Sequence, residues 1–283
     1  MTAPRVSIVV PSFNQGAFIE QTLASILGQN WPNLELIVID GGSTDGTLAV
    51  LERYRTSITH LISEPDRGQA DAINKGFRLS TGDILAWLNS DDMYLPCAIQ
   101  KAVAHLGEPT VPALTTGGVL WMYERRAEAR AFLPWPFDAE AMKARDRMFQ
   151  AASFWTRALW EKAGELDERR HFVLDWEWFL RASRHCTFTT IDDFLAIYRF
   201  HDAHKSSSGD DRRTQEIIAL VEEHGGPEWG AAYREVAANL PQMQQRLHWL
   251  RKVHLYPLRR ILYRGLYQRH GARVKTALAQ LNV

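Results

Sequence analysis

The stretch Ser80–Pro96, with the sequence STGDILAWLNSDDMYLP, contains the pattern that decides the fold. Its apolar run, Ile84–Leu88, has the length and composition of a buried strand, and the polar residues Asn89–Asp92 follow directly. Ligands of open α/β sheets bind at the carboxyl ends of the strands, which is where these polar side chains fall. The stretch therefore predicts a central strand of an α/β sheet with a binding site at its end.

Asp91 and Asp92 are adjacent acids at this strand end. Carboxylate oxygens are hard ligands that suit Mg²⁺ and Mn²⁺, and a bound divalent ion would hold a diphosphate against them. The alternative is that both acids only cap a helix that begins near Pro96. The sequence on either side favours the metal site.

Strands and helices are expected to alternate along the first part of the chain. The expected strands are 6–10, 34–39, 58–63 and 84–88. The expected helices are about 19–27, 43–54, 68–79 and 96–106. Such an alternation predicts a doubly wound, mostly parallel, Rossmann-like sheet.

The composition is that of an ordinary globular chain. Its 283 residues, 46% hydrophobic and 23% charged, suffice for one large α/β domain with an appendage. Two cysteines, Cys97 and Cys186, make no disulfide framework, as in a reducing compartment. Residues 1–5 do not resemble a signal peptide, and no apolar run approaches the roughly 20 residues of a spanning helix. We therefore expect a cytoplasmic protein.

The net charge of zero hides an uneven distribution. Residues 240–283 contain nine of the 33 Lys and Arg and none of the 33 Asp and Glu, so residues 1–239 hold 24 bases against 33 acids. Arginines, aromatics and helically spaced leucines around Pro257 predict membrane-surface contact through residues 245–279, at the inner face of the cytoplasmic membrane. The alternative is a helix packed on the acidic remainder. No nucleic-acid-binding motif accompanies the charge.

Familiar phosphate-binding loops are missing from the sequence. No GxGxxG follows the first strand, and GxxxxGK[ST] occurs nowhere. The loop Asp40–Gly46 is rich in glycine but carries acids and no lysine, so it suits a base or a ribose better than a phosphate. Alternatively, it is only a turn between a strand and a helix.

Four ordered blocks carry a resemblance to a known family: Val6–Asn14, Ile39–Thr47, Ser63–Gly76 and Thr81–Asp92. Together they resemble the signature of family 2 glycosyltransferases, which are inverting, nucleotide-sugar-dependent enzymes with the GT-A fold. The resemblance is close over about the first 100 residues and looser to about Ser208. It implies a GT-A-type sheet with a helical, basic C-terminal extension.

The resemblance also implies a donor-binding set at the strand ends. Its members are Pro11, Ser12, Phe13, Asp40, Asp66, Gly68, Asp71, Asn89 and Ser90. Phe13 is similar to positions that face the base, and Asp40 to an acid that accepts a hydrogen bond from a uracil- or thymine-like ring. Asn89–Asp91 matches the DxD motif, with Asp91 as metal ligand. Asn89 replaces the usual first acid, and Asp92 is the acid that would compensate.

The second half of the chain resembles the acceptor-binding part of the family. In Leu174–Arg181, Asp175 matches the base that takes a proton from the acceptor hydroxyl, which requires about 2.6–3.2 Å to that oxygen. Glu177 and Trp176 are expected in acceptor or secondary contacts. The alternative is that Asp175 caps a helix whose Trp178 and Phe179 are core residues.

The closing motif of the family resembles Tyr198–His201, followed by Ser206–Ser208. The resemblance implies that His201 completes the metal site, and an imidazole is a suitable Mn²⁺ ligand beside oxygen donors. The alternative is that His201 is a packed or solvated loop residue.

These interpretations divide the chain into a nucleotide-sugar-binding half (1–108), an acceptor-binding and catalytic half (109–210) and a helical extension (211–283) that is basic from about 245. The expected reaction moves a sugar from UDP- or dTDP-sugar to a hydroxyl of a glycan or lipid-linked saccharide with inversion, assisted by Mn²⁺ or Mg²⁺. One rival is a sugar-nucleotide-forming nucleotidyltransferase, although Pro11–Gly16 lacks the expected basic, glycine-rich loop. The other is a nucleotide-sugar or glycan-binding module without activity, which Asn89 makes conceivable.

Overall fold

The computed structural model describes residues 3–202, 205, 211–252 and 263–281, which belong to two compact units. The first unit comprises Met1–Phe137 and Arg147–His204, and the second comprises Asp138–Asp146 and Lys205–Val283. The short segment 138–146 thus belongs with the C-terminal residues, although it interrupts the chain of the first unit.

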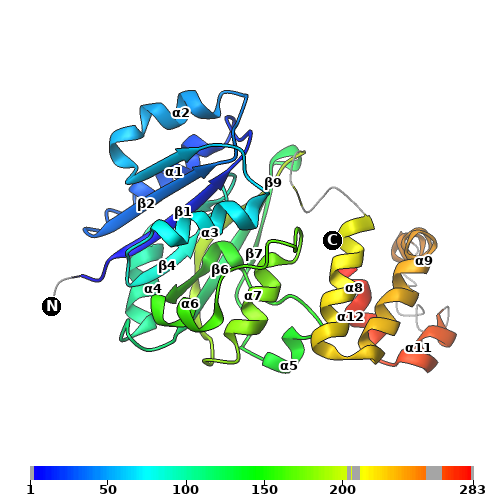
Figure 1. Ribbon diagram of the computed structural model, residues 1–283. Helices are drawn as coiled ribbons and strands as arrows, with labels where there is room; N and C mark the ends of the chain where they lie inside the picture. The colour runs from blue at the N-terminus through cyan, green and yellow to red at the C-terminus, as the bar shows by residue number, and fades with distance from the viewer. Residues whose placement is uncertain (1–2, 203–204, 206–210, 253–262, 282–283) are drawn as a thin grey trace. The chain divides into compact units, whose positions relative to one another are not determined.

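The first unit is built on a nine-stranded sheet (Figure 1). The strands lie in the order β3-β2-β1-β4-β8-β6-β9-β5, and β7 pairs with β6. Their bounds are β1 (Val6–Ser12), β2 (Leu34–Asp40), β3 (His60–Ser63), β4 (Ile84–Trp87), β5 (Met93–Tyr94), β6 (Leu114–Tyr123), β7 (Glu128–Phe132), β8 (Ser153–Thr156) and β9 (Thr189–Phe200). The first four strands are parallel, as expected, and β8 begins an antiparallel extension next to β4.

Helices connect the strands of this unit. They are α1 (Ile19–Leu27), α2 (Thr47–Arg53), α3 (Gln69–Leu79), α4 (Ala98–Leu106), α6 (Arg157–Ala163) and α7 (Leu174–Ala182). The α/β prediction is confirmed. Helix α4 begins at Ala98, close to the expected start, and Met93–Tyr94 before it pairs with β9 as strand β5. The residue that caps α4 is Cys97. Asp91 and Asp92 therefore do not cap this helix.

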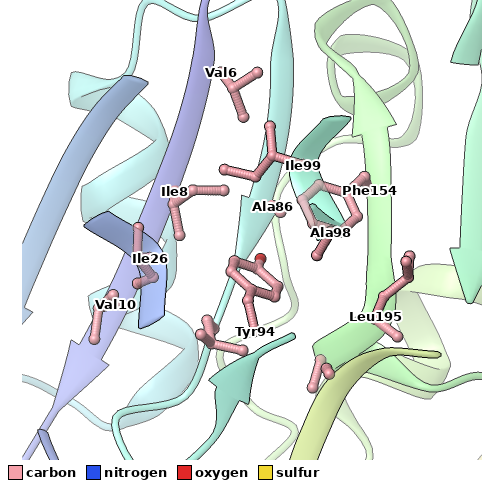
Figure 2. Close-up of a cluster of buried hydrophobic side chains, with 14 of the residues drawn as sticks. Val6, Ile8, Val10, Ile26, Ala86, Tyr94, Ala98, Ile99, Phe154 and Leu195 are labelled. Atoms are coloured by element: carbon pink, nitrogen blue, oxygen red, sulfur yellow. The ribbon is translucent and has the colours of Figure 1, made fainter. Parts of the chain in front are cut away.

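One face of the sheet carries a continuous apolar core (Figure 2). Ile8 and Val10 of β1 meet Ile26 of α1 and Ile99 of α4 there, and all four are fully buried. Alternation along β1 sends Val9 to the opposite face. A Cβ at position 76 of α3 would lie 2.4 Å from Val9 Cγ1, so Gly76 allows α3 to approach β1 closely.

The second unit is helical. Its helices are α5 (Ala139–Met142), α8 (Asp211–Gly225), α9 (Pro227–Lys252), α11 (Arg264–His270) and α12 (Arg273–Leu281). The Tyr233 hydroxyl of α9 donates a hydrogen bond to the carbonyl oxygen of Ala144, which ties the inserted segment to this unit. Val274 and Ala277 of α12 are fully buried. The predicted helical C-terminal extension is present.

The basic tail is described only in part. Several residues of the expected amphipathic pattern lie outside the described residues: Leu255, Tyr256, Pro257, Leu258, Arg259, Arg260 and Leu262. In the described part, Arg269 and Arg273 form ion pairs with Glu235 and Glu228 of α9. Both pairs lie within the helical unit, so packing of the tail on the acidic remainder and membrane contact through 245–279 both stay predictions. In the described ranges, none of the helices has the length and apolarity to cross a bilayer.

Candidate active site

The ends of β1, β2 and β3 lie side by side at one edge of the sheet. Ser12 pairs with Asp40, and Asp40 pairs with Ser63. The loops that follow β1 and β2 are joined, since the backbone N–H of Asn14 donates to Ser43 Oγ at 2.8 Å. Phe13, directly after β1, is 58% exposed. This edge therefore presents an aromatic ring beside polar loop groups.

The carboxylate of Asp40 is fully buried at the end of β2. It accepts hydrogen bonds from Ser43 N at 2.9 Å, Gly42 N at 3.2 Å, Ser43 Oγ at 2.5 Å and Ser63 Oγ at 2.7 Å. Asp40 thus fixes the loop after β2 to β3. Its predicted contact with the donor base stays a prediction.

The loop between β3 and α3, together with the first turn of α3, carries a second set of predicted donor residues. Asp66 Oδ1 accepts from Gly68 N at 2.8 Å. Asp71 is buried, and the hydrogen bonds and charges of Arg67, with the charge of Lys75, lower its pKa to about 2. Arg67 also pairs with Glu168 at 2.8 Å, although its side chain is 71% exposed. Sequence reasoning missed Arg67, a fixed cation between Asp66 and Gly68.

Asn89 is held by amide groups on two sides. Its Oδ1 accepts from Gln69 Nε2 at 2.8 Å, and its Nδ2 lies 3.4 Å from Gln150 Oε1 and 3.4 Å from Asp92 Oδ2. Gln150 is anchored by its Nε2, which donates to the carbonyl oxygen of Trp87 at 2.8 Å. Asn89 therefore offers a donor to Asp92, which an acid at this position could not do when ionised.

Asp91 and His201 are brought together from positions 110 residues apart. His201 Nε2 lies 3.1 Å from Asp91 Oδ2, and the two side chains are 4% and 16% exposed, respectively. The Phe18 ring packs against the His201 ring with centroids 4.2 Å apart, and the Arg199 guanidinium lies 5.1 Å from the Phe18 centroid. His201 is thus packed as the alternative expected, and it also contacts the predicted metal ligand. Ser206–Ser208 lie outside the described residues.

Asp92 supports the same loop from inside the protein. Its side chain is buried, and Oδ1 accepts from the backbone N–H of Arg199 at 3.1 Å. Burial, together with the neighbouring charge of Asp91, raises the pKa of Asp92 well above its usual range. Thr22 Oγ1 of α1 donates to the carbonyl oxygens of Ser90 and Asp92 at 2.9 and 2.7 Å. Residues 90–92 are therefore fixed by both β9 and α1.

The Asp91–His201 pair has the chemistry of a partial metal site. A carboxylate oxygen and an imidazole nitrogen suit Mn²⁺. Across the described residues, no three His, Cys, Asp or Glu side chains are grouped so as to hold a metal ion. The pair therefore fits an ion whose remaining ligands come from elsewhere, such as a diphosphate.

Asp175 lies in the first turn of α7, where its Oδ1 accepts from Trp176 N at 2.8 Å. The residue that caps α7 is Val173, so Asp175 is not the cap. Trp178 is buried, as the alternative expected, and packs on Trp87 and Trp155 with centroids 6.5 and 4.7 Å away. These contacts place α7 over β4 and β8. The approach of Asp175 to the acceptor stays a prediction.

The two residues that follow Asp175 are both buried. Trp176 is 1% exposed. Glu177 is also buried, and both of its carboxylate oxygens accept from Arg181, at 2.7 and 2.9 Å. Their acceptor contacts remain untested predictions.

Comparison with known proteins agrees with this architecture. A sequence model described as Glycosyl transferase family 2 matches residues 7–157. The chain is 29% identical over 185 residues to a PGL/p-HBAD biosynthesis glycosyltransferase of Mycobacterium bovis, with 64% of this chain and 70% of that protein covered. It is 34% identical over 194 residues to an uncharacterized glycosyltransferase of Mycobacterium tuberculosis, with 67% and 73% covered. A putative teichuronic acid biosynthesis glycosyltransferase of Bacillus subtilis is 34% identical over 119 residues, 40% of this chain and 46% of that protein.

Solved structures share the fold at low sequence identity. S. aureus TarS 1–349 in complex with UDP-GlcNAc superposes with a TM-score of 0.61 at 16% identity, over 81% of this chain and 70% of that one. In the longer TarS structure, the match covers only 39% of the TarS chain. The mannosyltransferase PcManGT of Pyrobaculum calidifontis, in complex with GDP-Man and Mn²⁺, gives a TM-score of 0.61 at 19% identity, over 100% and 88%. The sheet is therefore of the GT-A type.

Proposed function

Because the chain belongs to glycosyl transferase family 2, and is thus a glycosyltransferase, we propose that it moves a sugar from a UDP- or dTDP-linked donor to a hydroxyl of a cell-envelope glycan or lipid-linked saccharide, with inversion. The observation that carries this proposal is the Asp91–His201 pair at the end of β4, with Nε2 and Oδ2 3.1 Å apart. Two fold neighbours were solved in complex with UDP-GlcNAc and with GDP-Man, which supports a nucleotide-sugar donor here.

The donor would lie along the ends of β1–β4. Phe13 would face the base. Gly68 and Asp71, at the start of α3, would lie near ribose and diphosphate, with the exposed guanidinium of Arg67 offering positive charge to the diphosphate. Asp91 and His201 would hold Mn²⁺ or Mg²⁺, which stabilises the negative charge that develops on the departing diphosphate. Asn89 and Ser90 would shape the loop beside it.

The acceptor would be activated by Asp175. The carboxylate accepts the proton of the acceptor hydroxyl while that oxygen forms a bond to the anomeric carbon. The bond from the anomeric carbon to the diphosphate oxygen breaks, and its electron pair leaves with the nucleoside diphosphate. Attack opposite to the leaving group inverts the anomeric configuration. The acceptor class is proposed from the names of relatives in PGL/p-HBAD and teichuronic acid biosynthesis.

Two substitutions test this assignment. We expect Asp91→Ala and Asp175→Ala each to reduce transfer by at least about 10³-fold, since each removes a group that acts in the transition state. Only Asp91→Ala should also abolish Mn²⁺-dependent nucleotide binding, measured by calorimetry with UDP. The matched control is Asp83→Ala, an exposed acid before β4, which should keep both properties. Transfer at the wild-type rate by Asp175→Ala would exclude this residue as the base.

A further inference from the structure

We propose that Asp66, rather than Asp40, is the acid that recognises the donor base, through a hydrogen bond from a ring N–H such as N3–H of uracil. The inference rests on the proposed nucleotide-sugar function and assigns base selection within that site. It concerns an edge of the sheet where Ser12, Asp40 and Ser63 stand in register on β1, β2 and β3.

Asp40 has little capacity left for a ligand. An ionised carboxylate offers about four lone-pair sites. Ser43 Oγ occupies Oδ1, while Gly42 N, Ser43 N and Ser63 Oγ all lie within 3.2 Å of Oδ2. The side chain is also 0% exposed. A base could reach Asp40 only if this loop were rebuilt.

The Asp66 carboxylate lies against Gly41, the residue that follows Asp40. A Cβ at position 41 would stand 2.6 Å from Asp66 Oδ2, so Gly41 is the residue that admits this carboxylate. Gly41 is itself fixed to β1, because its N–H donates to the carbonyl oxygen of Ser12 at 2.8 Å. The Asp66 carboxylate therefore reaches the end of β2, across from β1.

The two oxygens of Asp66 have different surroundings. Oδ1 accepts from Gly68 N at 2.8 Å, which fixes the orientation of the carboxylate. Within the described part of the chain, no donor is bonded to Oδ2, and the side chain is only half-buried. Oδ2 is thus an oriented acceptor with capacity for a ligand N–H.

The end of β1, next to Gly41, carries groups that can contact a nucleotide base. Phe13 follows Ser12 directly and is 58% exposed, and aromatic rings bind bases by stacking. Ser12 Oγ is buried and has no hydrogen-bond partner among the described residues. A stacking ring, an unsatisfied hydroxyl and an oriented carboxylate oxygen together suit a base with a ring N–H donor.

Asp66→Asn tests the assignment with almost no change of shape. The amide oxygen of the introduced asparagine can still accept from Gly68 N, while its NH₂ group replaces Oδ2. This NH₂ group would place a donor against the N3–H donor of uracil, so no hydrogen bond forms. It can donate a hydrogen bond to N3 of cytosine. We expect the wild-type protein to bind UDP about 10- to 100-fold more tightly than CDP with Mn²⁺ present, and the variant to lose or invert that ratio. Calorimetric titration with both nucleotides measures it.

Glu64→Gln is the matched control, because Glu64 lies in the same loop, is 56% exposed and pairs with Lys75 at 3.1 Å. It should keep the wild-type ratio. A measurement that needs no variant uses N3-methyl-UDP, which the wild-type protein should bind at least about 10-fold more weakly than UDP.

The outcomes separate this inference from the proposed function. If the wild-type protein binds UDP and N3-methyl-UDP equally, or if Asp66→Asn keeps the UDP preference, Asp66 does not read the base. If the wild-type protein binds no nucleoside diphosphate with Mn²⁺, the proposed donor class itself is wrong.

Discussion

At the residue scale, Phe18 packs against both Arg199 of β9 and the histidine of the Asp91–His201 pair. It precedes α1 and lies between two residues of the β9 end: the His201 ring, with centroids 4.2 Å apart, and the Arg199 guanidinium, 5.1 Å from the ring centroid. An imidazole must be oriented before its nitrogen can act as a ligand, and groups around a metal site usually provide that orientation. If His201 binds the proposed metal ion, Phe18 would therefore be a positioning residue for its ring.

We expect Phe18→Ala to raise the Mn²⁺ concentration needed for half-maximal UDP binding by about 10-fold, as is typical when supporting groups of a metal site are lost. Phe18→Leu, which keeps an apolar contact with the His201 ring, should raise it less. Titration of Mn²⁺ at fixed UDP, followed by calorimetry, gives the values without relying on turnover. An unchanged titration in Phe18→Ala would show that His201 is oriented by other contacts.

At the element scale, the parallel half of the sheet was predictable and the rest was not. Strands β1, β2 and β4 are mostly apolar runs, such as Val6–Val10 of β1. Their apolar character follows from burial on both faces of the sheet. Strand β5 is only Met93–Tyr94, and it exists because of its pairing with Ala196 and Ile197, about 100 residues away. No local pattern encodes such a pairing. The Asp91–His201 contact depends on it, so only family resemblance could anticipate this part of the site.

The same limit applies to side-chain partners. The acids of the donor loops could be found by their position after strands, but their assignment to ligand or scaffold depends on neighbours from other strands. Ser63 of β3 donates a hydrogen bond to the Asp40 carboxylate, and the absence of a side chain at Gly41 leaves room for the Asp66 carboxylate. Both facts are tertiary, and neither follows from the order of residues.

The amino-terminal ends of the parallel strands, opposite the candidate site, contain a buried acid that should make stability depend on pH. Glu35 of β2 is 1% exposed and accepts from Ser7 Oγ, Thr81 N and Thr81 Oγ1 at 2.5, 2.8 and 2.9 Å. Burial alone would raise the pKa of Glu35, but these hydrogen bonds and the charge of Arg5 outweigh it and hold the pKa below its ordinary value. The ionised form therefore stabilises the fold above the unfolded-state pKa, and this contribution is lost as the pH falls through the folded-state value.

We expect Glu35→Gln to lower the free energy of unfolding at pH 7 by about 1–3 kcal/mol, because the amide NH₂ cannot accept the bonds that one carboxylate oxygen accepts. The difference from the wild-type protein should shrink as the pH falls below the ordinary pKa of a glutamate and towards the lowered folded-state pKa of Glu35, because protonation begins in the unfolded state and then reaches the folded state. Urea denaturation at pH 7 and pH 4 measures both values. A difference that stays constant with pH would mean that the charge of Glu35 contributes nothing.

At the scale of the whole molecule, the chain combines a GT-A-type unit with a helical unit that carries the basic tail. Within the helical unit, Glu235 accepts from Arg269 and lies 2.6 Å from His270 Nε2, so part of the positive charge of the tail is balanced internally. The exposed Arg264 and Lys275 belong to the same two C-terminal helices. Their charge is what the predicted membrane contact would use.

We expect the full chain to sediment with vesicles that contain about 30% anionic lipid more than with zwitterionic vesicles, and to lose that preference in 0.5 M salt, since exposed charges are screened over a few ångströms there. The double variant Arg264→Glu with Lys275→Glu should weaken the binding. Arg234→Glu, which removes a cation of α9 paired with Glu222, is the control outside the tail. Equal sedimentation with both vesicle types would remove the basis for membrane contact.

The contacts of Asp91 and Asp92 with the end of β9 restrict where residues can be inserted in this part of the chain. Asp92 accepts a hydrogen bond from the backbone N–H of Arg199 in β9, and Asp91 contacts the side chain of His201, the residue that follows the end of β9. Insertion of one amino acid between Arg199 and His201 would leave both Asp91 and the histidine recognisable in an alignment. It would nevertheless shift the imidazole away from Asp91, so a homologue that keeps both residues can still lack the contact between them.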